Sequence, residues 1–312
     1  MSAILEVNGL QKRYGETVAV EGLTFAVERG EVFGLLGPNG AGKTTTISML
    51  CGLVAPSRGT ATICGLDLVR DRDAAKRHIG FVPQDLALYP TLSARKNLVF
   101  FARLYGLGGA ELDERVEWAL ATVALSDRAR DAVQTFSGGM KRRLNIAVGL
   151  LHRPDILFLD EPTVGVDPQS RNHIFDNVEQ LNREGMTVVY TTHYMEEAER
   201  LCRRVGIVDH GKLIALGAPK ALVAEHGGGV LKLGISEGDG PALLGRAQAL
   251  PDIVSARREN GVLEVESSKA HETLGALFAV TSELGVRVTS VQLLEPSLET
   301  VFLHLTGRRL RE

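Results

Sequence analysis

The sequence predicts an α/β protein with a parallel-sheet core, an antiparallel β edge and a helical subdomain, followed by a small C-terminal α/β domain. Two patterns carry this prediction. Compact apolar runs, typical of buried parallel strands, alternate with helical patterns over roughly the first 220 residues. A glycine-rich break then precedes a shorter stretch with the order βαββαβ, the order of a ferredoxin-like domain. With 312 residues and 44% hydrophobic content, the chain can bury a core in both parts.

The first domain, residues 1–224, begins with two alternating segments and continues with buried strands. "ILEVNGL" and "GLTFAVERG" alternate apolar and polar residues, as expected of an antiparallel edge. Helical periodicity dominates between Ser93 and Leu151, which predicts a helical subdomain at about residues 85–152, inserted into the sheet. The parallel strands are expected at residues 30–37, 79–84, 155–162 and 187–193.

A linker is expected at residues 225–229, where three glycines interrupt the periodicity, and the accessory domain then covers residues 230–312. A hairpin turn is expected at Asn260-Gly261. A last helix, from about Ser297, carries an apolar face that must pack either on the domain's own sheet or on a partner. The residues of that face are Leu298, Val301, Phe302 and Leu305. The other expected elements are strands at 230–236 and 286–294 and helices at 241–249 and 269–284.

Composition limits the setting and the classes of partner. The formal net charge of −3 gives no electrostatic reason to expect a nucleic-acid partner. The cysteines Cys51, Cys64 and Cys202 are scattered without metal-like spacing, which indicates a reducing, cytoplasmic setting. The sequence contains neither the pattern of a signal peptide nor a window of roughly 18 uninterrupted apolar residues. We therefore expect a cytoplasmic chain that can still bind a membrane protein.

The stretch "GPNGAGKTT" fits G-x-x-x-x-G-K-[ST], follows a strand-like run and precedes a helical one. Glycines let the backbone wrap phosphate oxygens, Lys43 would reach the β and γ phosphates, and Thr44 would bind Mg²⁺. The alternative is a chance glycine turn before a helix. The nucleotide-binding residues expected here are Gly37, Pro38, Asn39, Gly40, Ala41, Gly42, Lys43, Thr44 and Thr45.

Three candidates end strands of the same predicted sheet. "ILFLDEP" places Asp160 at the end of a buried strand, where a carboxylate is costly unless a cation meets it. We expect Asp160 to bind Mg²⁺ through water and Glu161 to polarise the attacking water, although both acids could instead cap the next turn. His193 ends "TVVYTTH" at the same edge of the sheet. It is expected to contact the γ-phosphate, or else it is an ordinary satisfied polar group.

Further candidates for nucleotide contact lie outside these two groups. Gln84 ends the run "IGFVPQ" and could sense both Mg²⁺ and a partner surface. Tyr14, in "KRYG", could stack on adenine, or is an ordinary exposed tyrosine. In "FSGGM", Ser137 can cap a helix whose free N–H groups, behind it at Gly138 and Gly139, attract anions. One domain therefore contains two phosphate-binding signals.

In this order, these residues resemble the ATP-binding cassette family of transport ATPases over roughly residues 4 to 220. The resemblance implies a P-loop NTPase cassette that binds ATP and Mg²⁺ and hydrolyses ATP, with Glu161 and His193 as catalytic residues. It also implies a head-to-tail homodimer, in which "FSGGM" of one chain completes the nucleotide site of the other. Asp167, in "VGVD", matches the family's position and joins the expected nucleotide-binding residues.

The chain departs from the family pattern at two places. "FSGGM" replaces the usual "LSGGQ", so Met140 lacks the side-chain amide of glutamine. "VGVD" replaces the usual "SALD", which loses a hydroxyl at Val164. Neither departure removes Lys43, Asp160, Glu161 or His193, so hydrolysis is expected at both sites of a homodimer.

A narrower resemblance concerns the direction of transport. "DEPTVGVDP", "TTHYMEEAE" and "EPSLETVFLHLTGR" resemble the ATPase subunits of type-2 exporters, including the daunorubicin-resistance type. This implies a separately encoded membrane permease, export of a hydrophobic or amphiphilic compound, and a place at the inner face of the cell membrane. Two alternatives stay open: a soluble cassette ATPase acting on DNA or ribosomes, and an importer ATPase. The role of the C-terminal domain, in dimer contact, regulation or permease docking, stays open as well.

Overall fold

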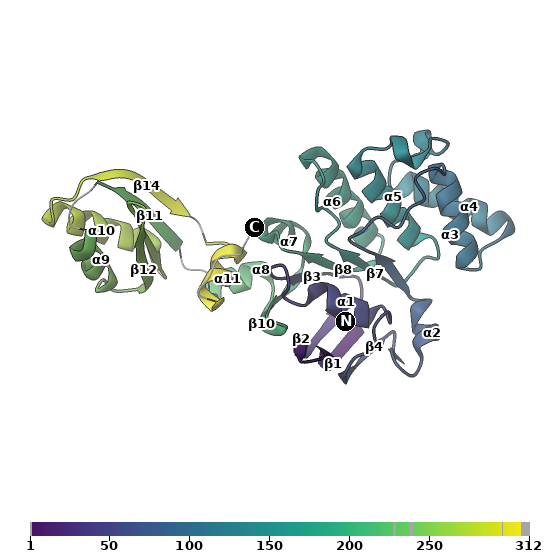
Figure 1. Ribbon diagram of the computed structural model, residues 1–312, viewed down its shortest axis with the longest axis horizontal. Helices are drawn as coiled ribbons and strands as arrows, with labels where there is room; N and C mark the ends of the chain where they lie inside the picture. The colour runs from purple at the N-terminus through teal and green to yellow at the C-terminus, as the bar shows by residue number, and fades with distance from the viewer. Residues whose placement is uncertain (1, 227–228, 237–239, 295, 307–312) are drawn as a thin grey trace. The chain divides into compact units, whose positions relative to one another are not determined.

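The computed structural model describes residues 2–226, 229–236, 240–294 and 296–306. The chain divides into two compact units, Met1–Leu216 and Gly217–Glu312. The first unit contains two sheets with helices around them, and the second contains one sheet with its own helices (Figure 1).

The central sheet of the first unit forms from the apolar runs in which the sequence predicts buried strands. Its order is β10-β9-β3-β8-β7-β6, and the pairs from β9 to β6 are parallel. Strands β3, β7 and β8 are buried along their whole length, as a parallel sheet covered on both faces requires. The strands are β3 Val32–Leu36, β6 Ile79–Val82, β7 Ile156–Asp160, β8 Thr187–Thr192, β9 Arg204–Asp209 and β10 Lys212–Gly217.

The expected antiparallel edge is a sheet of its own, with the order β2-β1-β4-β5. Its strands are β1 Ala3–Tyr14, β2 Thr17–Glu28, β4 Arg58–Ile63 and β5 Leu66–Asp67. A hydrophobic core of this unit lies where the two sheets face each other. There the rings of Phe25, from β2, and Phe33, from β3, stack with centroids 5.2 Å apart.

The helices of the first unit include the predicted helical subdomain. It consists of α3 Ala94–Leu104, α4 Gly109–Thr122 and α5 Gly138–Leu150, with the 3₁₀ turns η1 Ser126–Arg128 and η2 Val133–Thr135. These three helices pack on one another. The remaining helices are α1 Lys43–Leu50, α2 Arg72–Lys76, α6 Pro168–Arg183 and α7 Met195–Leu201.

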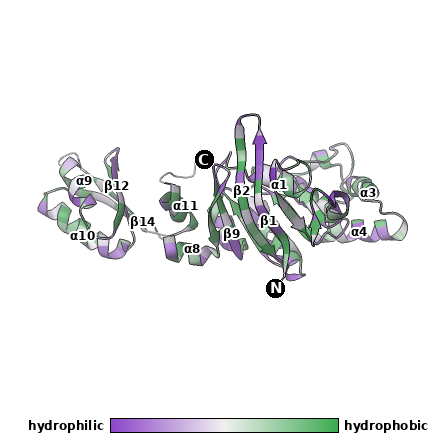
Figure 2. Cartoon of the chain, turned by 90° about the horizontal axis from the view of Figure 1, so that it is seen from below, coloured by the Kyte–Doolittle hydropathy of each residue, from purple (hydrophilic) through white to green (hydrophobic). Residues whose placement is uncertain are grey.

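The second unit has the βαββαβ order that the sequence predicts. Its sheet order is β12-β13-β11-β14 and neighbouring strands are antiparallel. Asn260 and Gly261 both have positive φ, 49° and 77°, which suits the predicted two-residue hairpin turn. Hydrophobic and hydrophilic residues alternate around α9 and α10 (Figure 2), which cover the sheet with their apolar faces. The elements are β11 Gly229–Ile235, α9 Gly240–Gln248, β12 Ile253–Glu259, β13 Val262–Ser267, α10 Ala270–Glu283 and β14 Val288–Leu294.

The division between the units falls earlier than the expected linker at residues 225–229. Helix α8, Pro219–His226, belongs to the second unit because it packs on the last helix, α11, Leu298–Thr306. Gly229 already begins β11, and residues 227–228 lie outside the described residues. On α11, Leu298, Val301 and Phe302 are buried. Packing on α8 therefore contributes to covering the apolar face that the sequence left without an assigned neighbour.

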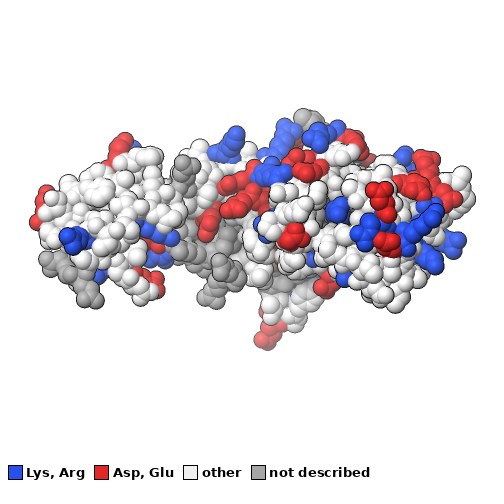
Figure 3. Space-filling view, turned by 90° about the horizontal axis from the view of Figure 1, so that it is seen from above, with Lys and Arg blue, Asp and Glu red and all other residues white. Residues whose placement is uncertain are grey.

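Within the described residues, no helix is long and apolar enough to cross a membrane. On the face shown in Figure 3, Lys and Arg lie interspersed with Asp and Glu over the helical subdomain. Arg95, for example, pairs with both Asp113 and Glu117. Charges of both signs thus share this surface.

Candidate active site

The phosphate-loop stretch connects β3 to α1 through a sharp turn. Gly42 precedes α1 with a φ of 101°, and a Cβ at this position would lie 2.5 Å from Ala19 O. Only glycine accommodates this conformation so close to another backbone segment. Lys43 begins α1 and is 4% exposed; its Nζ donates to Gly37 O at 2.7 Å and to Pro38 O at 3.0 Å. The ammonium group therefore lies inside the loop.

Asp160 ends β7 and is 1% exposed. Thr191, directly opposite on β8, donates its hydroxyl to Asp160 Oδ1 at 2.7 Å. Burial raises the pKa of Asp160 above its usual value, while hydrogen bonds from Thr191 and Thr44 act in the opposite direction. The protein thus holds a carboxylate whose ionised form would gain from a nearby cation.

Glu161 follows with a φ of +46°, a left-handed conformation that is uncommon for a residue with a side chain. Its backbone N–H donates to Thr191 Oγ1 at 2.9 Å. Its Oε1 lies 3.1 Å from Lys43 Nζ, and its Oε2 lies 3.2 Å from His193 Nδ1. Glu161 therefore bridges the phosphate-loop lysine and the histidine that follows β8.

The structure brings together the predicted residues at the carboxyl ends of three adjacent parallel strands. Lys43 follows β3, Asp160 and Glu161 follow or end β7, and His193 follows β8. Ligands of open α/β sheets bind outside this edge. The site combines a buried cation, two carboxylates and a half-buried imidazole, which are the groups needed to bind phosphate and a metal and to accept a proton.

The "FSGGM" motif forms the start of α5, as its composition predicts. Ser137 Oγ accepts from Met140 N–H at 3.2 Å and caps the helix. Ser137 and Gly138 are exposed, whereas Gly139 is buried against Ser170 of α6. Asp167 caps α6 in the same way, accepting from the N–H of Ser170 at 2.9 Å, and this bond lowers the pKa of Asp167. The two predicted motifs therefore meet at neighbouring helix starts.

Gln84 and Tyr14 have exposed side chains. Gln84 follows β6, the strand next to β7, and Tyr14 ends β1 with its ring 49% exposed. Lys12 Nζ lies 5.0 Å from the centroid of the Tyr14 ring. Both positions leave the side chain free to meet a ligand, and their assignment to nucleotide contact stays a prediction.

Nothing in the sequence marked Thr191 and Arg142, which hold these segments together. Thr191 serves both acidic residues, as described above. Arg142, on α5, is buried and donates to the main-chain carbonyl of Gln84, to Pro83 O at 3.5 Å and to Val164 O at 3.3 Å. Burial lowers the pKa of Arg142. The basic run after "FSGGM" was visible in the sequence, but nothing in it indicated that one arginine turns inward.

A second cluster of polar side chains lies elsewhere in the first unit. Cys64, His78 and Asp155 offer ligand atoms within 4.8 Å of one another, although their spacing in the sequence gave no sign of it. Arg29 already pairs with Asp155 Oδ1 at 2.9 Å and donates to Cys64 Sγ at 3.8 Å, and His78 Nδ1 lies 2.7 Å from Asp155 Oδ2. Because a guanidinium competes with any metal ion here, we interpret the cluster as an ion-pair network.

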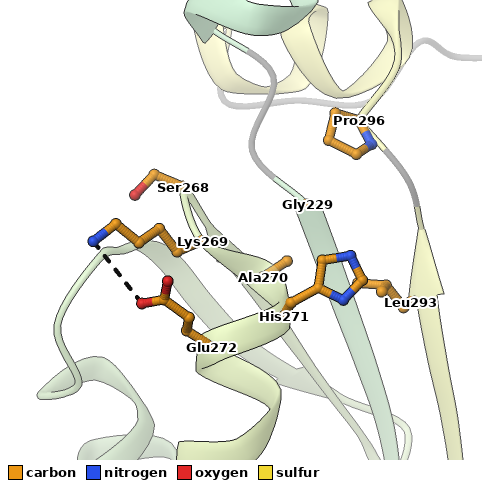
Figure 4. Close-up of a pocket in the computed structure, with 8 residues that line it drawn as sticks. All are labelled: Gly229, Ser268, Lys269, Ala270, His271, Glu272, Leu293 and Pro296. Carbon is orange, nitrogen blue, oxygen red and sulfur yellow. Dashed lines mark ion pairs between the residues drawn. The ribbon is translucent and has the colours of Figure 1, made fainter.

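The second unit contains a hollow at the first turn of α10 (Figure 4). Gly229, Leu293 and Pro296 form part of its wall, and Lys269 Nζ lies 3.9 Å from Glu272 Oε2 beside it. Lys269 Nζ also lies 3.6 Å from Asp252 Oδ2. One ammonium group thus pairs with two carboxylates at the surface.

Because Gly139 packs against Ser170 and Gly138 does not, we expect alanine substitutions at the two glycines to change stability differently. A Cβ at Gly139 would lie 2.1 Å from Ser170 Oγ and 2.2 Å from Ser170 Cβ, whereas one at Gly138 would meet only Gly165 O, at 3.9 Å. We expect Gly139→Ala to destabilise the protein by about 1–3 kcal/mol, because α5 and α6 must separate. Gly138→Ala should leave the thermal unfolding midpoint unchanged or slightly higher, since alanine favours the helix.

The double variant Gly139→Ala/Ser170→Gly serves as the rescue control. It removes the atoms that the new methyl group would strike, and the remaining contact, 3.5 Å to Ser170 Cα, is ordinary. Its unfolding midpoint should therefore recover most of the loss. A midpoint as low as that of Gly139→Ala alone would show that this contact is not the cause.

This chain is similar to curated proteins over nearly their whole length. It is 46% identical to the linearmycin resistance ATP-binding protein of Bacillus subtilis strain 168, over 99% of this chain and 100% of the relative. It is 40% identical to a daunorubicin resistance ATP-binding protein of Streptomyces coeruleorubidus, over 99% of this chain and 98% of the relative. A Nod factor export ATP-binding protein of Paraburkholderia xenovorans strain LB400 is 41% identical, with 99% of both chains covered.

Solved structures match the fold over about seven tenths of this chain. The subunit cbiO1 of Clostridium perfringens, described as part of the ABC transporter complex cbiONQ, superposes with a TM-score of 0.67 and 31% identity over 72% of this chain and 92% of that chain. The ATP-binding cassette MJ0796, described as dimeric with ADP and Pi, superposes with a TM-score of 0.62. It is 26% identical over 69% of this chain and 98% of that chain. The model of the ABC transporter family matches residues 20–164. With this site at the sheet edge and relatives of such identity over its whole length, the chain belongs to the ATP-binding cassette family of transport ATPases.

Proposed function

We propose that this chain hydrolyses ATP to energise a separate membrane permease, which exports a hydrophobic or amphiphilic compound such as a drug or lipid. The observation that carries the proposal is the contact of Glu161 with both Lys43 and His193, beside the buried Asp160. The resistance and export functions in the names of the similar proteins support the direction of transport. The chain then works at the inner face of the cell membrane, where its permease lies.

Asp160 and Thr44 would hold Mg²⁺, and their chemistry fits that ion. Mg²⁺ prefers hard oxygen ligands, and both residues offer oxygen atoms at one place. Burial raises the pKa of Asp160, and a cation beside it would favour the ionised carboxylate, which supports its role as a ligand. Gln84, after the neighbouring strand, offers an amide oxygen as a further ligand. When bound, Mg²⁺ would neutralise charge that develops on the phosphate oxygens.

The catalytic roles follow from the contacts of each side chain. Lys43 would meet phosphate oxygens; its glycine-shaped loop and its buried charge support this role. Glu161 acts as the general base for the attacking water, and His193 orients it through the contact between Nδ1 and Oε2. Tyr14 offers an exposed ring to the adenine base.

A second copy of the chain is the partner that the "FSGGM" motif requires. Ser137 and Gly138 are exposed at the start of α5, where helix N–H groups attract an anion. Asp167 begins α6 beside them. In a head-to-tail dimer Ser137 and the N–H groups at the start of α5 would meet the γ-phosphate bound by the other chain, and two-fold symmetry would make two complete sites. The dimeric state given for MJ0796 supports this arrangement.

The permease would dock on an exposed apolar surface of the helical subdomain, formed by Tyr89, Phe100 and Leu104. Their side chains are 46%, 37% and 69% exposed, and the rings of Tyr89 and Phe100 meet edge to face at 4.9 Å. Arg142 ties the segment after β6, which leads to Tyr89, to the helix that carries "FSGGM". Contact with the permease could thus reach the nucleotide site through a short chain of hydrogen bonds.

The two units divide the work in this proposal. Each residue assigned to nucleotide contact or catalysis lies in Met1–Leu216. Gly217–Glu312 forms its own sheet and core, so it acts as an accessory domain outside the hydrolysis chemistry.

The role of Glu161 is tested by Glu161→Gln. The amide keeps the shape and the contact with His193 but cannot accept a proton, so turnover of ATP should fall by roughly 10²–10⁴-fold. Binding of Mg²⁺ and ATP should persist, and the variant should accumulate as an ATP-bound dimer, because a charge that would repel the γ-phosphate is gone. Steady-state hydrolysis and size-exclusion chromatography with ATP measure both effects. Turnover at the wild-type rate would rule out the general-base role.

The role of Asp160 is tested by Asp160→Asn, which keeps an acceptor for Thr191 and removes the buried charge. Because the pKa of Asp160 is raised in the fold, ionised Asp160 destabilises the nucleotide-free protein at pH values above that raised pKa. The nucleotide-free variant should therefore melt at or above the wild-type temperature near neutral pH. The difference should vanish below pH 3.8, the usual pKa, where the carboxyl is protonated in both states.

The same variant should lose the thermal stabilisation that Mg²⁺ and ATP together give the wild type. Thermal shift with ATP, with and without Mg²⁺, makes the comparison. If Asp160→Asn is still stabilised by Mg²⁺ to the wild-type extent, Asp160 is not a ligand of the metal.

The docking surface is tested by Leu104→Glu. A charge on the most exposed residue of this surface should abolish co-purification with the permease, while the isolated chain keeps its ATPase rate. Leu53→Glu is the matched control, because Leu53 is 55% exposed and lies outside the helical subdomain. Equal co-purification of both variants with the permease would place the docking site elsewhere.

A further inference from the structure

Glu197, on α7, is a charged residue buried beneath the site, and it touches none of the groups assigned to the nucleotide. Its side chain is 2% exposed. Its Oε1 accepts from Thr163 Oγ1 at 2.7 Å, and its Oε2 accepts from Tyr190 OH at 3.0 Å and from Thr192 Oγ1 at 2.8 Å. One carboxylate thus gathers three hydroxyl groups from two segments of the chain.

Such a buried carboxylate is costly, so its presence needs a reason. An apolar side chain of similar volume packs as well or better than a buried ion pair in many proteins. The nearest cation is Arg171, whose Nε lies 3.8 Å from Glu197 Oε1 and has no hydrogen-bond partner in the described part of the chain. Compensation therefore rests mainly on the three neutral hydroxyl donors. That arrangement specifies geometry more than it adds stability.

Two of these donors stand beside the two residues assigned to catalysis. Thr163 lies two residues after Glu161, and Thr192 immediately precedes His193. Thr192 Oγ1 also accepts from the N–H of Tyr194 at 2.9 Å, so it holds the backbone on the other side of His193 as well. The third donor, Tyr190, lies within β8, three residues before His193 and further along the chain from Glu161.

Glu161 also needs support from its surroundings. A residue with a side chain persists at a φ of +46° only where neighbouring contacts hold it there. Thr191 holds the N–H of Glu161, and the carboxylate of Glu197 holds Thr163 on its C-terminal side. The 3.2 Å contact between Glu161 Oε2 and His193 Nδ1 joins two loops that Glu197 anchors from below.

We propose that Glu197 is a positioning residue for ATP hydrolysis, which sets the relative placement of Glu161 and His193 through Thr163 and Thr192. It touches neither nucleotide nor metal. The proposal rests on the catalytic roles proposed above for Glu161 and His193.

The first test is Glu197→Gln. The amide matches the side chain in size but offers a single acceptor oxygen, so at least one of the three hydroxyls must give up or reverse its bond. We expect kcat for ATP hydrolysis to fall about ten- to hundredfold, because misplacement of catalytic groups by about 1 Å can cost 10²-fold. The Kd for a fluorescent ATP analogue with Mg²⁺ should stay within about twofold of the wild type.

Glu196→Gln is the matched control. It makes the same chemical change one residue earlier on α7, where the side chain is exposed and forms no ion pair within the described residues. It should leave kcat, Kd and the unfolding midpoint unchanged. A ten- to hundredfold loss of kcat in Glu196→Gln as well would trace the effect to the helix and refute the specific role of Glu197.

Variants of the three donors distinguish an effect on the placement of the catalytic residues from an effect on stability. They test the proposal even if Glu197→Gln fails to fold. Thr163→Val and Thr192→Val each remove one hydroxyl next to a catalytic residue in the chain, and Tyr190→Phe removes the hydroxyl of a residue that lies further from both along the chain. All three should lower the unfolding midpoint, since each removes a buried hydrogen bond. Only the two threonine variants should lower kcat, by fivefold or more, while Tyr190→Phe stays within about twofold.

Equal losses of kcat in all three variants would mean a purely structural network, and wild-type kcat in both threonine variants would refute the proposal directly. Glu161→Gln and His193→Ala are measured in parallel. If these two retain turnover, the catalytic assignments fail. If they lose turnover while the threonine variants keep it, the assignments stand and only the role of Glu197 fails.

Discussion

The buried ion pair between Lys43 and Glu161 is the interaction on which the arrangement of the site depends. Nζ and Oε1 are 3.1 Å apart and both side chains are almost fully buried. Burying two charges is costly unless their remaining hydrogen-bonding capacity is used. Here the carbonyls of Gly37 and Pro38 accept from the lysine, and His193 meets the second oxygen of the glutamate. The pair therefore constrains the phosphate loop and the ends of β7 and β8 together.

Neutral hydroxyl groups, more than opposite charges, hold the carboxylates of Asp160 and Glu197. Thr191 donates to Asp160 and accepts from the N–H of Glu161, so one side chain orients both acids. A hydroxyl holds a carboxylate in place without cancelling its charge, whereas a lysine or arginine in the same place would cancel it. The negative charge of Asp160 then remains available to the metal ion proposed above. This choice of donor links the packing between β7 and β8 to the chemistry of the site.

The sequence was most informative about residues whose position follows from a local motif and from the order of the strands. The phosphate loop, the acidic pair and His193 follow apolar runs, and parallel strands bring their ends to one edge, so their meeting could be predicted. The boundary between the units could not. The glycines at 227–229 looked like a linker, but α8 packs on α11, more than 70 residues further along the chain, and local composition carries no trace of such a contact.

Residue types and their spacing determined the family, the strand ends that bear chemistry and the caps at Ser137 and Asp167, because these depend on local backbone geometry and on strand order. Only the tertiary structure decided which polar residues turn inward. Arg142 and Glu197 resemble ordinary surface residues of a helix in the sequence, and Thr191 resembles any residue of a buried strand. Their roles depend on which carbonyl or hydroxyl groups another segment brings within about 3 Å, the range in which a hydrogen bond forms. Packing between elements decides which groups come within that range, and no short stretch of sequence contains this information.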